Sequence, residues 1–180
     1  MKPRSGLVLC LAILFVTQIA RAADGDVSIT VEKKRVNSGG SEIRKPSDTT
    51  KRTESYAFTV SVENQTFKPL ENLEAKYIIF YKHEQLGVKG PARKLTKSGS
   101  STIASIDSLG KASFDTDSVS LTRAALIGSD PSSYEYFSNG AKPTAEDSIT
   151  GIWVRLYNKD GSLFAEYAYP AGLTSSETWQ

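Results

Sequence analysis

The strongest constraint on the fold is a two-residue alternation of apolar and polar side chains that recurs along the chain. It is clearest at residues 56–63, where an aromatic or aliphatic side chain occupies every second position. Successive side chains of a strand point to opposite faces, so this period indicates a strand with one buried face. Similar patterns occur at 27–32, 73–82, 101–106, 111–124, 151–157 and 163–169. No stretch carries the period of an ordinary amphipathic helix, so we expect an all-β chain.

About seven such strands, separated by turn residues, predict an antiparallel β-sandwich. In the long connection at 128–147, Asp130 precedes Pro131. An Asp side chain can cap free backbone N–H groups and Pro suits the first helical position, so one or two helical turns are expected there. We expect one sandwich domain over residues 23–173, followed by a polar C-terminal tail at 174–180 in which Trp179 is the exception.

Three segments carry a resemblance to a known fold: SYAFTVSVEN, LEAKYIIFY and GIWVRLYNKDGSL. They resemble strands B, C, F and G of immunoglobulin-like or fibronectin-III-like domains, over most of 55–82 and 148–170. The chain lacks the Cys-Trp-Cys hallmark and is similar to small secreted bacterial β-sandwich proteins, many of unassigned role. The resemblance implies a fold that serves adhesion, assembly and binding, and it transfers no catalytic residue.

The first 22 residues predict export. Lys2 and Arg4 precede an apolar run at 7–16, and small residues follow at Ala20 and Ala22. This is the layout of a signal peptide, and the run is too short to cross a hydrocarbon core of ~30 Å as a helix. We therefore expect cleavage near Ala22 and a secreted or periplasmic product without a membrane span, with an uncleaved anchor as the alternative.

Removal of this leader changes the composition. It takes away the one cysteine and the one methionine, so the mature chain can form no disulfide and depends on packing for its stability. It also leaves 19 basic against 20 acidic residues. Residues 27–97 carry 14 basic and 8 acidic side chains, whereas residues 98–180 carry 5 and 10. This asymmetry could guide association with an anionic surface, but the better interpretation is that folding brings the two halves together and mixes their charges.

Residues suited to catalysis or metal binding are sparse. His83 is the single histidine and is expected to be exposed, and a mature chain without cysteine lacks the usual zinc and iron–sulfur ligands. Asp115 and Asp117 could begin an acid/base pair or a calcium site, but a solvated strand face is the better interpretation. The sequence therefore predicts no catalytic residue, no metal site and no cofactor.

Basic runs occur at 33–35, 44–52 and 89–97. Export argues against nucleic acid as their partner, so anionic glycans or membrane phosphates are more plausible. Lysines that protect strand edges from aggregation are the usual explanation of such residues. The Asn64-Gln65-Thr66 sequon has meaning only in a eukaryotic secretory route.

A hairpin is predicted at 151–169, with its turn near Asp160 and Gly161. A two-residue loop there pairs Val154 with Tyr167, whereas a three-residue loop with a bulge at Gly161 would bury the unpaired carboxylate of Glu166. We therefore expect the first register. Its outer face carries a candidate ligand-binding patch of five residues: Trp153, Arg155, Tyr157, Phe164 and Glu166.

The predicted patch has three interpretations. Its rings could be covered by the connection at 128–147, which holds Tyr134, Tyr136 and Phe137, because monomers seldom expose large apolar patches. They could instead form a platform for sugars or a peptide, or an interface with another chain.

The function expected from the sequence is non-enzymatic binding of a protein or polysaccharide in the cell envelope or outside it. A carbohydrate-binding module that uses the aromatic patch is the first alternative. A hydrolase is the second and the least favoured, because the usual catalytic sets are missing.

Overall fold

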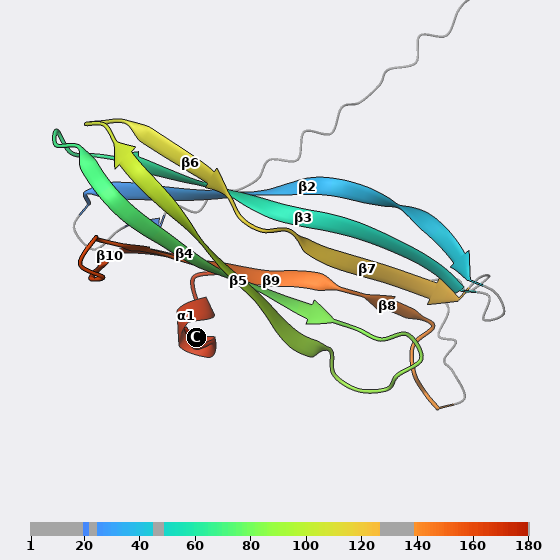
Figure 1. Ribbon diagram of the computed structural model, residues 1–180. Coiled ribbons are helices and arrows are strands. Elements are labelled where there is room, and N and C mark those ends of the chain that lie inside the picture. The colour runs from blue at the N-terminus through green and yellow to red at the C-terminus, as the bar shows by residue number, and fades with distance from the viewer. Residues whose placement is uncertain (1–19, 22–24, 45–48, 127–138, 180) are drawn as a thin grey trace, which may run out of the picture.

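The structure is a computed structural model that describes residues 20–21, 25–44, 49–126 and 139–179 (Figure 1). Almost all of the predicted leader lies outside these residues, as do Asp130 and Pro131. The described chain is all-β, as predicted, apart from one short helix. Its strands are β1 (Ala20–Arg21), β2 (Val27–Arg44), β3 (Thr49–Asn64), β4 (Leu70–His83), β5 (Arg93–Ile106), β6 (Lys111–Asp115), β7 (Val119–Leu126), β8 (Thr144–Glu146), β9 (Ser148–Tyr157) and β10 (Leu163–Tyr169).

The strands form two antiparallel sheets. A six-stranded sheet has the order β1-β2-β3-β7-β8, with β6 also paired to β3, and a four-stranded sheet has the order β10-β9-β4-β5. The core lies between them, because the alternating apolar side chains of both sheets point inward. Among its fully buried members are Ile29, Val60 and Val62 from the first sheet and Ile79, Val154 and Leu156 from the second.

The described residues form more strands than the roughly seven predicted from the sequence, and several of these strands are longer than predicted. Residues 111–124, expected as one strand, are split into β6 and β7 because the register on β3 shifts there: Thr59 pairs with Asp115, but Tyr56 pairs with Val119. The extra residue forms a bulge that Thr116 stabilises, since its buried hydroxyl accepts the Phe58 N–H at 2.9 Å.

The β2–β3 hairpin also extends beyond its apolar part. Its distal half includes residues 37–44 and 49–55, which are rich in Gly, Ser, Thr and charged residues and lie outside the strands predicted at 27–32 and 56–63. Backbone pairing with β2 and β7 continues along this half of β3 (Figure 1). Backbone hydrogen bonds, rather than an alternation of apolar and polar side chains, therefore define this part of the hairpin.

Polar contacts also join the two sheets. The Tyr77 hydroxyl of β4 accepts the backbone N–H of Asp117 in the β6–β7 bulge at 2.8 Å. It can pass β5 because Gly99 has no side chain: a Cβ there would lie 2.2 Å from the hydroxyl oxygen. Burial raises the pKa of Tyr77, so the ring is held neutral. Asp147, described below, makes another such contact.

The one described helix, α1 (Leu173–Ser176), follows β10. It is not in the connection at 128–147, whose described part, residues 139–147, consists of a turn and β8. Within the described ranges no helix is long and apolar enough to cross a membrane.

Candidate functional site

The β9–β10 hairpin combines features of both predicted registers. Along the sheet, Val154 pairs with Tyr167 and Arg155 with Glu166, as expected. At the turn, however, Asn158 rather than Lys159 closes the loop, donating its N–H to the Ser162 carbonyl at 2.9 Å, and Gly161 has a φ of 81°. The two-residue turn is therefore wrong: a three-residue loop with a glycine bulge forms instead.

A second bulge restores the register. It lies between Leu163, which pairs with Tyr157, and Ala165, which pairs with Leu156. The residue at the bulge, Phe164, packs against the main core, and Leu163 is 51% exposed. The prediction that Phe164 lies on the outer face is thus wrong, because the second bulge displaces it.

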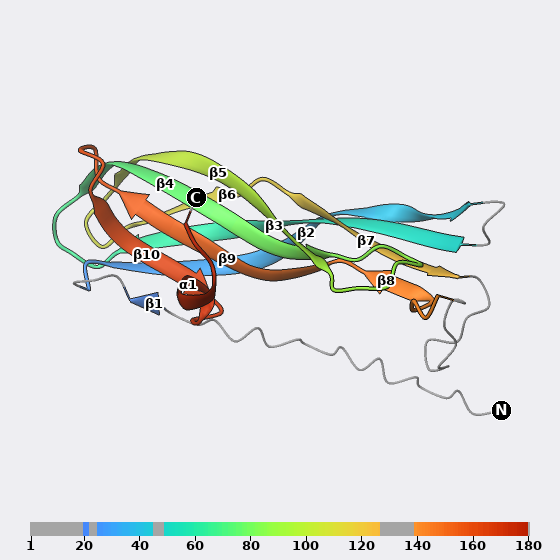
Figure 2. The ribbon, with the colours of Figure 1, turned by 90° about the horizontal axis from the view of Figure 1, so that it is seen from below.

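Trp153 does lie on the outer face, but it is covered. Only 4% of it is exposed, and it packs with Ile78, Phe80 and Leu173 in a small second cluster. The cover is the C-terminal segment, residues 173–179, which passes over the four-stranded sheet (Figure 2). A covering element was expected, but at 128–147, where Tyr134, Tyr136 and Phe137 lie outside the described residues.

Three contacts hold the C-terminal segment. Trp179 packs edge-on against Trp153 with ring centroids 5.3 Å apart. The side chain of Leu173 lies over Gly151, where a Cβ would come within 3.1 Å of both Leu173 methyl carbons. At the far end, Lys94 of β5 donates to Glu177 at 2.7 Å. Residues 174–179 therefore belong to the folded surface rather than to a free tail.

Arg155 completes the cluster. Its guanidinium lies 4.7 Å from the Trp153 ring centroid and 4.5 Å from that of Trp179, and its Nε donates to Glu166 at 2.7 Å. The predicted Arg155–Glu166 pair is thus formed. The guanidinium therefore contacts both indoles, which also pack against each other. Tyr157 lies further along β9, half-buried beside Lys76.

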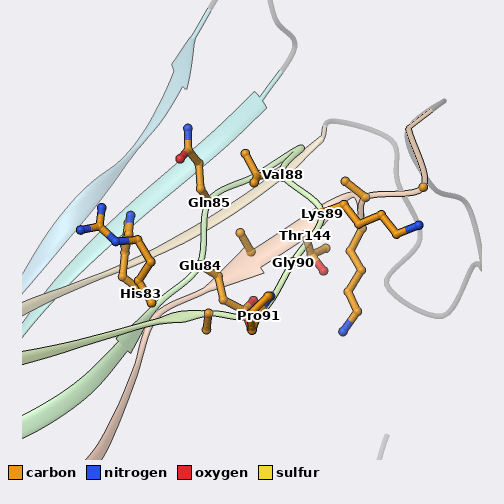
Figure 3. Close-up of a pocket in the computed structure, with 14 residues that line it drawn as sticks. His83, Glu84, Gln85, Val88, Lys89, Gly90, Pro91 and Thr144 are labelled. Atoms are coloured by element: carbon orange, nitrogen blue, oxygen red, sulfur yellow. The ribbon is translucent and has the colours of Figure 1, made fainter.

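A different concave surface lies at the end of the molecule where β4 and β5 are joined (Figure 3). It is a pocket of about 310 Å³ between the loop at 84–92 and the segment at 140–145. His83 lies on one side of it and Lys89 on the other (Figure 3). The lining residues are His83, Glu84, Gln85, Val88, Lys89, Gly90, Pro91, Ala92, Arg93, Gly140, Ala141, Lys142, Thr144 and Ala145.

The two walls of this pocket are tied together. Asn139 donates its side-chain amide to the Gly87 carbonyl and accepts the N–H of Ala141, each at 2.9 Å. Glu84 accepts the N–H of Glu146 at 3.2 Å. Hydrogen bonds of this kind between two loops fix their separation, so the pocket is largely formed before any ligand arrives.

Buried Asp147 holds two residues of the pocket lining, His83 and Glu84, in place. One carboxylate oxygen lies 2.8 Å from Nδ1 of His83 and accepts the Glu84 N–H at 3.0 Å, and the other accepts the Thr122 N–H at 2.9 Å. These bonds join β4 to β7 across the two sheets. His83 is partly exposed, as expected, but its ring has this structural partner, which the sequence did not reveal.

The pocket carries an excess of positive charge. It is lined by Lys89, Arg93 and Lys142 against the single carboxylate of Glu84. Among the described residues, none of these three cations has an ion-pair partner. The basic run at 89–97 supplies two of them, and the acidic half of the chain supplies Lys142, which sequence reasoning missed.

A second groove differs from this pocket, because its basic and acidic side chains pair with one another. In it Arg52 pairs with Glu54 at 2.8 Å and Arg123 with Glu146 at 3.1 Å. Lys33 lies 4.1 Å from the Tyr56 ring centroid, and burial lowers its pKa although the nearby Glu54 carboxylate opposes this. The hydrogen bond from Tyr56, followed by the charges of Arg52 and Arg35, lowers the pKa of Glu54.

The two carboxylates proposed as a weak acid/base or calcium candidate do not share a strand. Asp115 ends β6, where it pairs with Lys34 and accepts the Thr59 hydroxyl at 2.7 Å, while Asp117 lies in the bulge. These bonds from Lys34 and Thr59 lower the pKa of Asp115. Within the described chain, no group of three or more His, Cys, Asp or Glu side chains could hold a metal ion.

Comparisons with known proteins identify no family. No family model matches the sequence, and no curated protein matches it. Among solved structures, similarity is found to the Northeast Structural Genomics Consortium target SoR45 (10% identity, TM-score 0.37, covering 88% of this chain and 98% of that one). A protein from Akkermansia muciniphila is similar at 11% identity and TM-score 0.37, over 91% of this chain and 81% of that one.

A Bacteroides uniformis β-glucuronidase is similar over 77% of this chain but only 12% of its own length, at 8% identity and TM-score 0.31. Similarities this low carry no argument about function.

Proposed function

We propose that the protein is exported after loss of residues 1–22 and works without catalysis, by binding another macromolecule in the cell envelope or outside it. The leader pattern supports export. The two-sheet fold supports an immunoglobulin-like sandwich, an architecture that presents binding sites on loops at its ends.

The observation that carries this proposal is the cationic pocket between 84–92 and 140–145. It is concave, its walls are hydrogen-bonded to each other, and three of its cations lack a carboxylate partner within the described part of the chain. Its volume is about 310 Å³, at the small end of the range for ligand sites. A protein partner usually covers a flat area of roughly 800 Å² on each side. The pocket therefore favours a polysaccharide, one unit of which enters it.

Binding is favoured over hydrolysis because the side chains best suited to catalysis already have structural partners. His83 lies against Asp147, and Asp115 pairs with Lys34. Glycoside hydrolysis usually requires two carboxylates that flank the scissile glycosidic bond. Glu84 is the single acidic residue that lines this pocket.

The aromatic patch is the second candidate for carbohydrate binding. Its support is the cluster of Trp153, Arg155 and Trp179, since aromatic rings stack on sugars. Access to Trp153 would require residues 173–179 to leave the sheet, breaking the Lys94–Glu177 pair and exposing Leu173. This cost places the patch behind the cationic pocket.

The test is affinity electrophoresis of residues 23–180 through gels that contain neutral or anionic polysaccharides, followed by measurement of polymer length and reducing ends. Retardation by a polymer that keeps its length supports the proposal. A polymer that is shortened refutes the non-enzymatic assignment, and free migration through every gel refutes polysaccharide binding.

A further inference from the structure

We propose that the pocket binds an acidic sugar unit of a polysaccharide through the carboxylate or sulfate group of that unit, with Lys89, Arg93 and Lys142 as the anion-binding residues. This inference rests on the proposed function and adds to it the chemical class of the ligand and the residues that select it.

The first argument is the arrangement of charge on the β4–β5 hairpin. Where this hairpin opens into the pocket, Lys82 lies directly opposite Lys94, and His83 directly opposite Arg93. Successive side chains alternate between the two faces of a strand, so Lys82 and Lys94 lie on the outer face of the sheet, where Glu177 pairs with Lys94. On the opposite face His83 bonds to Asp147, whereas Arg93 lines the pocket without an acidic partner in the described residues. An anion in the pocket would supply that partner.

The second argument is that both walls of the pocket contribute cations. Lys89 and Arg93 belong to the β4–β5 loop and its end, and Lys142 to the opposite segment. The amine of Lys89 lies near the opposite wall, since a Cβ on Gly140 would be 3.6 Å from its nitrogen. Arg93 offers a planar fork that suits a carboxylate or sulfate, while the lysines act as point charges.

The third argument is the rest of the lining, which suits a sugar ring better than a bare ion. Val88, which is 56% exposed, and Pro91 give an aliphatic wall for the C–H face of a ring. Gln85, Thr144 and Glu84 place donors and acceptors within the same pocket for hydroxyl groups. A free inorganic anion would use neither the aliphatic wall nor the acceptor of Glu84.

The test is calorimetric titration of residues 23–180 with four probes. They are a galacturonic acid tetrasaccharide, a sulfated tetrasaccharide, the carboxyl-reduced and therefore neutral form of the first, and vesicles that contain phosphatidylglycerol. We expect binding of one or both acidic tetrasaccharides and at least tenfold weaker binding of the neutral one. Comparison of the uronate with the sulfated probe shows which anion is preferred.

Variants locate the binding. Lys89→Ala combined with Lys142→Ala should weaken the binding of the acidic tetrasaccharide about tenfold or more, because charge-assisted hydrogen bonds are lost. Arg93→Lys, which keeps the charge but loses the fork, should weaken it less. The matched control is Lys111→Ala combined with Lys159→Ala, two exposed lysines outside the pocket, which should bind like the unmodified protein. Thermal unfolding of each variant verifies folding.

Equal binding of the neutral and acidic probes, equal affinity of the pocket and control variants, or binding to vesicles alone would each overturn this inference. A protein that is retarded by polysaccharides but whose pocket variants bind normally would refute only the inference. A protein that migrates freely in every polysaccharide gel would refute the proposed function itself.

Discussion

Two leucines ten positions apart test whether the C-terminal segment is part of the folded structure. Leu173 of α1 is 5% exposed and packs with Trp153 and Phe80, whereas Leu163 at the hairpin bulge is 51% exposed. Replacing each by Ala removes the same atoms. The two variants therefore differ only in what those atoms contact, and Leu163→Ala is a matched control for Leu173→Ala.

The expected magnitudes are well separated. Leu→Ala at a fully buried site costs about 2–5 kcal/mol. Leu173 lies in a thin cluster with one sheet beneath it, so we expect the lower half of that range, about 2–3 kcal/mol. For Leu163→Ala we expect a change within about 0.5 kcal/mol, as for other exposed positions. In a domain of this size the first loss lowers the melting temperature by roughly 4–12 °C.

The assay is urea unfolding followed by tryptophan fluorescence and far-ultraviolet circular dichroism. The free energies of unfolding of the variants are compared with the same slope of free energy against urea concentration. Leu173→Ala should also make Trp153 more accessible to acrylamide. If Leu173→Ala and Leu163→Ala proved equally stable, with unchanged quenching, the packing of residues 173–179 on the sheet would be refuted.

Three further changes have definite expected outcomes. Asn64→Asp should lower the free energy of unfolding by about 2–4 kcal/mol, because the buried amide donates to the Lys68 and Asp107 carbonyls and a carboxylate cannot donate. Asn158→Asp is the milder control. Equal losses of stability in the two variants would contradict this explanation. Gly99→Ala should cost about 1–3 kcal/mol because its Cβ would meet the Tyr77 hydroxyl, while Gly172→Ala, with nothing within 4 Å, should be nearly neutral in the same urea titration. Burial raises the pKa of Tyr77 and of Tyr167. The unfolded chain therefore loses these protons first, and stability that is complete below about pH 10 should fall as the pH rises toward the folded-state pKa values. Tyr167→Phe should make that fall shallower in melts between about pH 8 and pH 11, and an unchanged slope would show that Tyr167 does not contribute.

The all-β class and much of the core could be predicted because side-chain period reports burial directly. Val60 and Val62 in β3, and Val154 in β9, occupy apolar positions of the alternating pattern and are fully buried. Pairing of Arg155 with Glu166 followed from the same logic, since the alternative register would have buried a charge.

The irregularity between β6 and β7 could not be predicted, because it depends on contacts from elsewhere in the chain. The bulge between β6 and β7 is stabilised by Thr116 and by Tyr77 of the other sheet, and neither contact has a local signal. The distal part of β2 and β3 was missed for a related reason: its ladder consists of backbone hydrogen bonds and its side chains are polar.

The pocket was only half visible in the sequence. The run at 89–97 is evidently basic, but Lys142, Asn139 and Asp147 come from a region with an acidic excess and meet it only through the fold. The cover of Trp153 was unexpected because residues 174–180 are polar in composition. Trp179 was the one signal that the segment could dock on an apolar surface.

The most direct test of the cationic pocket as the binding site is a chemical-shift map of residues 23–180 titrated with the galacturonic acid tetrasaccharide. The account predicts that the amide signals of 84–90, 92–93, 139–142 and 144–145 move together along one binding curve, while the indole signals of Trp153 and Trp179 stay in place. Movement of the indoles, with the pocket amides unchanged, would contradict it and assign binding to the aromatic patch.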